Sequence, residues 1–165
     1  MKNESTQNGF TLIELLVVIG IVGVLATVML AVLGTTRKQS IDTAIKQTLS
    51  GTKNQAELYY YNNANSYSNV CASGAVSLIG ATRSIYLQVA DAAKKAGIAI
   101  ASVKVNPVGG GAYNQVTCND SSAAWAAEVP LSTSKSGAPV MLCVDSAGKL
   151  KQESVVLGVG AVICQ

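Results

Sequence analysis

The feature that most constrains this chain is an apolar run over residues 10–34, FTLIELLVVIGIVGVLATVMLAVLG, in which Glu14 is the one charged residue. As a helix the run would be about 37 Å long at ~1.5 Å per residue, long enough to cross a bilayer. A secretory signal peptide has a shorter apolar stretch, and a carboxylate inside an apolar run costs free energy unless it finds a partner. We therefore predict a membrane-spanning helix in which Glu14 has a function.

The residues around Glu14 form a recognisable pattern. Gly9 is followed by Phe10-Thr11-Leu12-Ile13-Glu14 and a further apolar stretch, and this closely resembles the processing and methylation signature of type IV pilins and their relatives. The resemblance implies that residues 1–9 are a prepilin leader, that a prepilin peptidase cuts after Gly9, and that the new amine of Phe10 is N-methylated.

The same resemblance implies that the subunit occupies two locations in turn. The subunit would first span the inner membrane once, and the inner-membrane pilus assembly machinery would then add it to a homo-oligomeric helical filament, the extracellular pilus. The methylated amine stays cationic, so in apolar surroundings we expect Glu14 to contact the Phe10 amine of a neighbouring subunit. The alternative for Glu14 is a side chain that reaches toward the lipid headgroups.

The pattern after the apolar run predicts that the helix continues through residues 35–62. This stretch lacks proline, and residues that could face a core recur at helical spacing: Ile41, Ile45, Leu49, Thr52, Ala56 and Tyr59 or Tyr60. We expect one long helix, with residues 10–34 as its transmembrane and filament-core half and residues 35–62 as its amphipathic half.

The sequence pattern of residues 63–165 predicts one small globular head. A loop rich in Asn, Ser and Gly over residues 62–83 is followed by a short helix with Ser84 as its N-cap and Gly97 beyond its end. The candidate strands, joined as antiparallel hairpins, are Ile98–Val105, Tyr113–Cys118, Ala123–Leu131, Val140–Asp145 and Lys149–Val156. The predicted fold class is therefore α+β, with a long N-terminal helix packed on a small antiparallel sheet through Val140, Leu142, Val144 and Trp125.

The four cysteines, Cys71, Cys118, Cys143 and Cys164, all follow the apolar run, and none forms a Cys-x-x-Cys pair. This spacing disfavours zinc and thioredoxin-like chemistry. In an exported head an even number suits two disulfides, with three connectivities possible. We favour Cys71 with Cys118 and Cys143 with Cys164, because each pair would tie a loop or the last segment to a strand.

The composition disfavours catalysis, cofactors and metals. The chain has no histidine, which removes the commonest general base and the imidazole metal ligands. The acids Asp120, Glu128, Asp145 and Glu153 are scattered without the spacing of a calcium loop. We therefore predict no catalytic residues, no cofactor and no metal site.

Several functions share such an N-terminus. The leading hypothesis is a structural pilus subunit for adhesion, motility or DNA uptake, and the alternatives are a minor pilin, a type II secretion pseudopilin, or a membrane-anchored extracellular enzyme or binding module. Nucleic acid is a lesser possibility, because the net charge is only +3 and a solvated face is the favoured interpretation of the basic residues Arg83, Lys94, Lys95, Lys104, Lys149 and Lys151.

Overall fold

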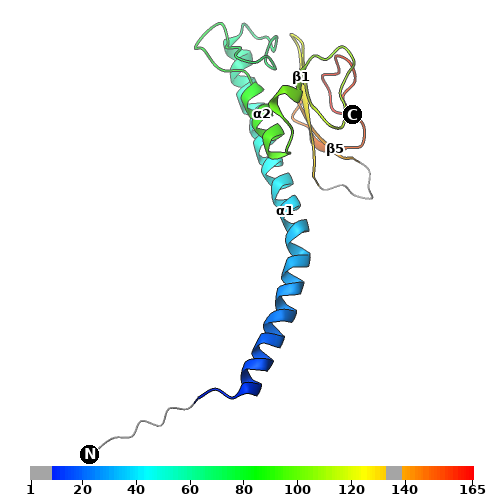
Figure 1. Cartoon of the computed structure of the whole chain (residues 1–165). Coiled ribbons are helices and arrows are strands. Elements are labelled where there is room, and N and C mark those ends of the chain that lie inside the picture. The colour runs from blue at the N-terminus through cyan, green and yellow to red at the C-terminus, as the bar shows by residue number, and fades with distance from the viewer. Residues whose placement is uncertain (1–8, 133–138) are drawn as a thin grey trace, which may run out of the picture. The chain divides into compact units, whose positions relative to one another are not determined.

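The computed structural model describes residues 9–132 and 139–165 (Figure 1). The chain divides into two compact units, residues 1–37 and 38–165, and helix α1 (Leu12–Asn62) contributes to both. The predicted α+β class is confirmed, with a long apolar N-terminal helix followed by a five-stranded, mostly antiparallel sheet. The predicted boundaries at 9, 34 and 62 stay predictions, since nearly all of the leader lies outside the described residues.

From here on, we use the word head for the whole second unit, residues 38–165, which includes the predicted head and the second half of α1. Within the head, α1 carries one buried stripe. Its members recur every three or four residues and are 0–2% exposed: Ile45, Leu49, Thr52, Ala56 and Tyr59. This is the helical period, so the side chains line one face of α1 and form its contribution to the main core. The amphipathic pattern predicted from the sequence is thus confirmed for this half of α1.

The connection after α1 runs to helix α2 (Tyr86–Lys95), which buries Val89, Ala90, Ala92 and Ala93. The predicted N-cap of this helix is wrong. Ile85 occupies the N-cap position without a side-chain cap, and the Ser84 hydroxyl donates instead to the Ala72 carbonyl at 2.8 Å. A short polar side chain bonds whichever backbone group the tertiary fold brings near, and here that group belongs to the connecting loop.

The sheet has the order β1-β2-β3-β4-β5. Its strands are β1 (Val103–Val105), β2 (Val116–Asp120), β3 (Trp125–Pro130), β4 (Met141–Asp145) and β5 (Leu150–Glu153). The predicted first strand is shorter than expected, because Ile100–Ser102 forms a 3₁₀ turn. The turn predicted between β3 and β4 lies mostly outside the described residues.

The expectation of antiparallel hairpins throughout is wrong at one edge. The pairs β2–β3, β3–β4 and β4–β5 are antiparallel, but β1 pairs parallel with β2. Parallel neighbours need a connection that carries the chain back to the same end of the sheet. Residues 106–115 make that return, with positive φ at Asn106 and Gly110 where the chain turns.

Both faces of the sheet are covered. The inner face contributes Trp125, Leu142 and Val144 to the main core, as predicted, and Val140 packs at its margin. The outer face is covered by residues 154–165, which follow β5 without regular secondary structure and which we call the strap. Leu157 and Cys164 of the strap are buried with Ala126 and Cys143 of the sheet.

Candidate assembly and processing site

The start of α1 is a capping box formed by Thr11 and Glu14. The backbone N–H and the hydroxyl of Thr11 donate to Glu14 Oε2 at 2.9 and 2.7 Å, and the Glu14 N–H approaches Thr11 Oγ1 at 3.4 Å. These contacts satisfy N–H groups that the first turn of a helix leaves without partners. Thr-x-x-Glu before an apolar run is the recognised signal of this motif, so the capping role of Thr11, not predicted above, could have been read from the sequence.

The predicted processing residues lie at this helix start. Gly9 and Phe10 precede α1 and are exposed, with Phe10 91% accessible. Phe10 and Glu14 line one shallow hollow together with Ile13, Val17 and Val18. The bond that would be cut, the aromatic residue and the carboxylate are therefore close together on accessible surface, although their roles stay predictions.

Apolar side chains remain exposed along the first unit. Every large apolar residue from Leu12 to Leu33 for which exposure is described is at least half exposed. By length and composition α1 can span a membrane, with a mean hydropathy of 3.0 over its most apolar 18 residues. An exposed apolar surface of this extent indicates contact with lipid or with other apolar helices, so the helix is compatible with membrane anchoring.

The glycines of this helix have open surroundings. A Cβ added to Gly20 or Gly23 would meet nothing within 4 Å. Glycine in a helix costs about 1 kcal/mol relative to alanine, and the fold of the single chain does not explain the choice. Small residues allow the close approach of apolar helices in lipid or in a filament, which is a use that fits these positions.

All four cysteines of the head are paired. Cys71 bonds Cys118 and Cys143 bonds Cys164, the two pairs favoured from the sequence. The first ties the connecting loop to β2, and the second ties the strap to β4. A carboxylate supports each link, since Asp120 accepts the Cys71 N–H and Asp145 accepts the Cys164 N–H, both at 3.0 Å.

Acids that are scattered in the sequence meet on the outer face of the sheet. Glu128 and Asp145 are completely buried and Glu153 is 7% exposed. The pKa of Glu128 is raised to about 7, because burial raises it most and the charge of Glu153 adds to the rise, while the Leu157 N–H and the Thr117 hydroxyl oppose it. No role was predicted for Glu128, and its one signal in the sequence is that it is a single acid inside the otherwise apolar strand WAAEVP.

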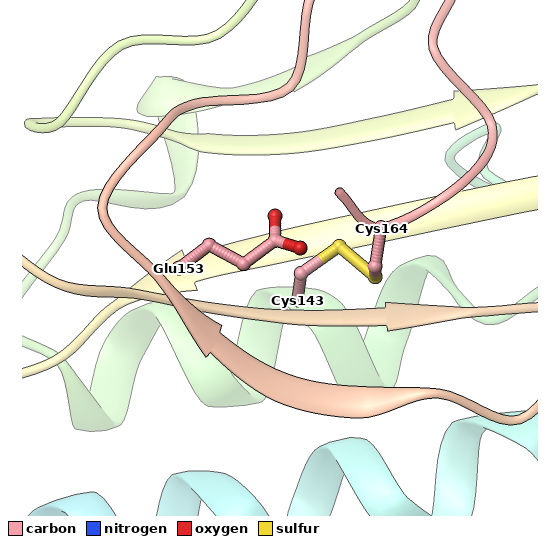
Figure 2. A group of neighbouring side chains, drawn as sticks. All are labelled: Cys143, Glu153 and Cys164. Atoms are coloured by element: carbon pink, nitrogen blue, oxygen red, sulfur yellow. A yellow bond between two sulfur atoms is a disulfide. The ribbon is translucent and has the colours of Figure 1, made fainter.

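One of these acids lies beside a disulfide. Figure 2 shows the Glu153 carboxylate pointing toward the Cys143–Cys164 bond, and the oxygen and the two sulfurs lie within 4.8 Å of one another. The two sulfurs form a disulfide bond, so neither is a free thiolate that could ligate a metal. Lys151 Nζ lies 3.4 Å from Glu153 Oε1 and offsets part of its charge.

The alternative functions find little support in the head. Of the basic residues proposed for a nucleic-acid patch, Lys95 pairs with Asp91, Lys151 pairs with Glu153, and Lys149 donates to the Cys164 carbonyl. A hollow lined by residues 74–76, 83, 84 and 87 has one ionisable side chain, Arg83. It therefore offers no acid–base pair for catalysis.

Comparison with known proteins agrees with the site. No curated protein and no solved structure matches the chain. A family model, the prokaryotic N-terminal methylation motif, matches residues 5–30. This motif supports a type IV pilin-like or pseudopilin-like protein, and it implies processing by a prepilin peptidase and handling by pilus assembly machinery. At residues 5–30 the chain carries the type IV prepilin-like signal motif.

Proposed function

We propose that this chain is a structural subunit of a type IV pilus or a related filament, assembled through its N-terminal helix. The observation that carries the proposal is the methylation motif at residues 5–30, which overlaps the exposed apolar half of helix α1. Proteins with this motif are structural. An apolar helix suited first to lipid and then to a bundle of its own copies accounts for both features.

Processing would create the contact that sets the register of the subunits. Cleavage after Gly9 gives Phe10 a cationic amine, and Glu14 is the carboxylate available to a neighbour's amine. Both capping bonds from Thr11 end on Oε2 of Glu14, so Oε1 is the oxygen that an incoming amine would approach. A charge-assisted hydrogen bond is strong in apolar surroundings, and a buried carboxylate without its partner is costly.

Mass spectrometry of the protein from its native cells tests the processing step. We expect a mature chain that begins at N-methylated Phe10. An intact Met1, or cleavage near Gly34, would support the membrane-anchored enzyme or binding module instead. Gly9→Ala is the informative variant, because a Cβ there meets nothing within 4 Å and leaves the fold intact.

Filament assembly is tested separately. We expect Glu14→Ala subunits to be processed but absent from sheared filaments, whereas Leu58→Ala, an exposed apolar change in the head half of α1, should be incorporated. Immunogold labelling of surface filaments then distinguishes an abundant shaft subunit from a minor pilin or a pseudopilin. Incorporation of Glu14→Ala at the normal level would contradict the proposed contact.

A further inference from the structure

The strap, residues 154–165, is held on the sheet by one polar side chain from each of three strands. Asn119 of β2 donates to the carbonyls of Gly158 and Ala161 at 3.1 and 2.9 Å. Glu128 of β3 accepts the Leu157 N–H at 2.8 Å, and Asp145 of β4 accepts the Cys164 N–H at 3.0 Å. The strap forms no ladder of its own, and these bonds and the Cys143–Cys164 disulfide help to keep it in place. The Leu157 carbonyl also accepts the Gly111 N–H at 2.7 Å, and the Ser154 and Cys164 carbonyls accept the Tyr113 hydroxyl and Lys149 Nζ.

Glu128 differs from the other anchors in the surroundings of its second oxygen. Asp145 uses both carboxylate oxygens, the second accepting the Lys149 N–H at 3.0 Å. Glu128 Oε1 is buried near Thr117 Oγ1, but the hydroxyl lacks good hydrogen-bond geometry. A Cβ built on Gly111 would lie 2.2 Å from Oε1, 2.9 Å from Thr117 Oγ1 and 3.0 Å from the Leu157 carbonyl oxygen. Three oxygens therefore converge over Gly111.

Such a cluster favours a carboxylic acid over a carboxylate. A proton on Oε1 would give the cluster a donor, with the Thr117 hydroxyl and the Leu157 carbonyl as nearby acceptors. Without the proton, the Thr117 hydroxyl can donate to Oε1, but the Leu157 carbonyl faces the buried charge with a lone pair. The Leu157 N–H can donate to Oε2 whether Glu128 is protonated or ionised. Protonation therefore lowers the free energy of the closed strap without changing this hydrogen bond.

The neighbouring charges act in the same direction. From β5, Glu153 places a second buried carboxylate on the same face, offset in part by Lys151. Asp145 of β4 is a third buried acid on this face, and its two oxygens accept the Lys149 and Cys164 N–H groups. The groups closest to Glu128 carry no charge: Thr117 of β2, Gly111 of the β1–β2 connection, Leu157 of the strap, and Cys143 of β4 in its disulfide. The pKa of Glu128, raised to about 7 chiefly by burial, agrees with this geometry.

We propose that Glu128 is a proton-operated latch: strap residues 154–163 are held most firmly on the sheet while Glu128 is protonated, and they open more readily when its proton passes to water. The Cys143–Cys164 disulfide keeps the released strap tethered. Opening uncovers Ala126 and the disulfide, which Leu157 and Ala161 cover in the closed state. The inference is independent of filament assembly.

Hydrogen exchange of the Leu157 amide, in the full chain in detergent micelles, tests the latch between pH 5.5 and 8.5. We expect its protection factor to fall about 30-fold, the value that follows from pKa values of 4.5 in the open state and about 7 in the closed state. The Ile98 amide, which donates to Ala93 at 2.9 Å, reports on the rest of the head and should remain better protected at every pH.

Two variants complete the test. Glu128→Gln should remove the decline at Leu157, and Glu57→Gln, which changes the acceptor of the Tyr67 hydroxyl, should leave it unaltered. If Glu128→Gln does not fold, ¹³C titration of the Glu128 carboxyl in the unaltered chain must show the same midpoint as the loss of protection. A pH-independent Leu157 amide, equal protection of Leu157 and Ile98, or a Glu128 that titrates below pH 5 would overturn the latch.

Discussion

Gly111→Ala should destabilise the head, because the added methyl group enters the oxygen cluster beneath the strap. Its Cβ would lie 2.2 Å from Glu128 Oε1, a distance at which something must move. Overpacking of a core costs typically about 1–3 kcal/mol, and loss of the Glu128–Leu157 hydrogen bond would add about 1–3 kcal/mol. We therefore expect a loss of about 2–6 kcal/mol in the free energy of unfolding.

Denaturant unfolding with the disulfides intact measures this loss, and the same loop supplies the matched control. A Cβ added to Gly109 meets nothing within 4 Å, so Gly109→Ala should change stability by less than about 0.5 kcal/mol. Because Glu128 is the closest obstacle, adding Glu128→Ala should make Gly111→Ala less costly than it is alone. Equal effects of the two glycine variants, or strict additivity with Glu128→Ala, would refute the packing described for this cluster.

Three further predictions concern the head. Because the pKa of Glu128 is raised, its contribution to stability is present below about pH 4.5 and is lost by about pH 7. We expect the free energy of unfolding, measured by thermal unfolding, to fall by about 3 kcal/mol over this pH range, and Glu128→Gln should lack this fall. Replacing Cys143 and Cys164 together by serine should lower the free energy of unfolding by roughly 3 kcal/mol, measured by denaturant titration, and an unchanged midpoint would show that the strap adds no stability. Leu49→Ala should cost about 2–5 kcal/mol in the same titration because Leu49 is completely buried, whereas Leu58→Ala at an exposed position should cost far less.

Much of the architecture could be predicted because its signals are local. The apolar run over residues 10–34 has a length that only a membrane or a helix bundle accommodates. The spacing of Ile45, Leu49 and Ala56 follows the helical period, which is a property of one segment alone. The class of the head follows similarly, because turn residues and alternating patterns divide residues 98–156 into short strands.

The errors arose where contacts between distant segments decide the structure. The parallel pairing of β1 with β2 depends on the path of residues 106–115 over the sheet, and Ser84 bonds Ala72 because the connecting loop returns to it. Neither contact leaves a pattern in its own segment, since a polar side chain or a strand edge accepts whichever partner the fold supplies.

The amino-acid sequence by itself determined the membrane-capable helix and the methylation motif, because hydrophobic length and a contiguous signal need no partner to be recognised. Only the tertiary structure decided that Glu128 is buried beneath the strap, since the register of β2, β3 and β5 places Thr117, Glu128 and Glu153 on one face. The cost of burying a carboxylate depends on what surrounds it, and these surroundings come from four separate parts of the chain.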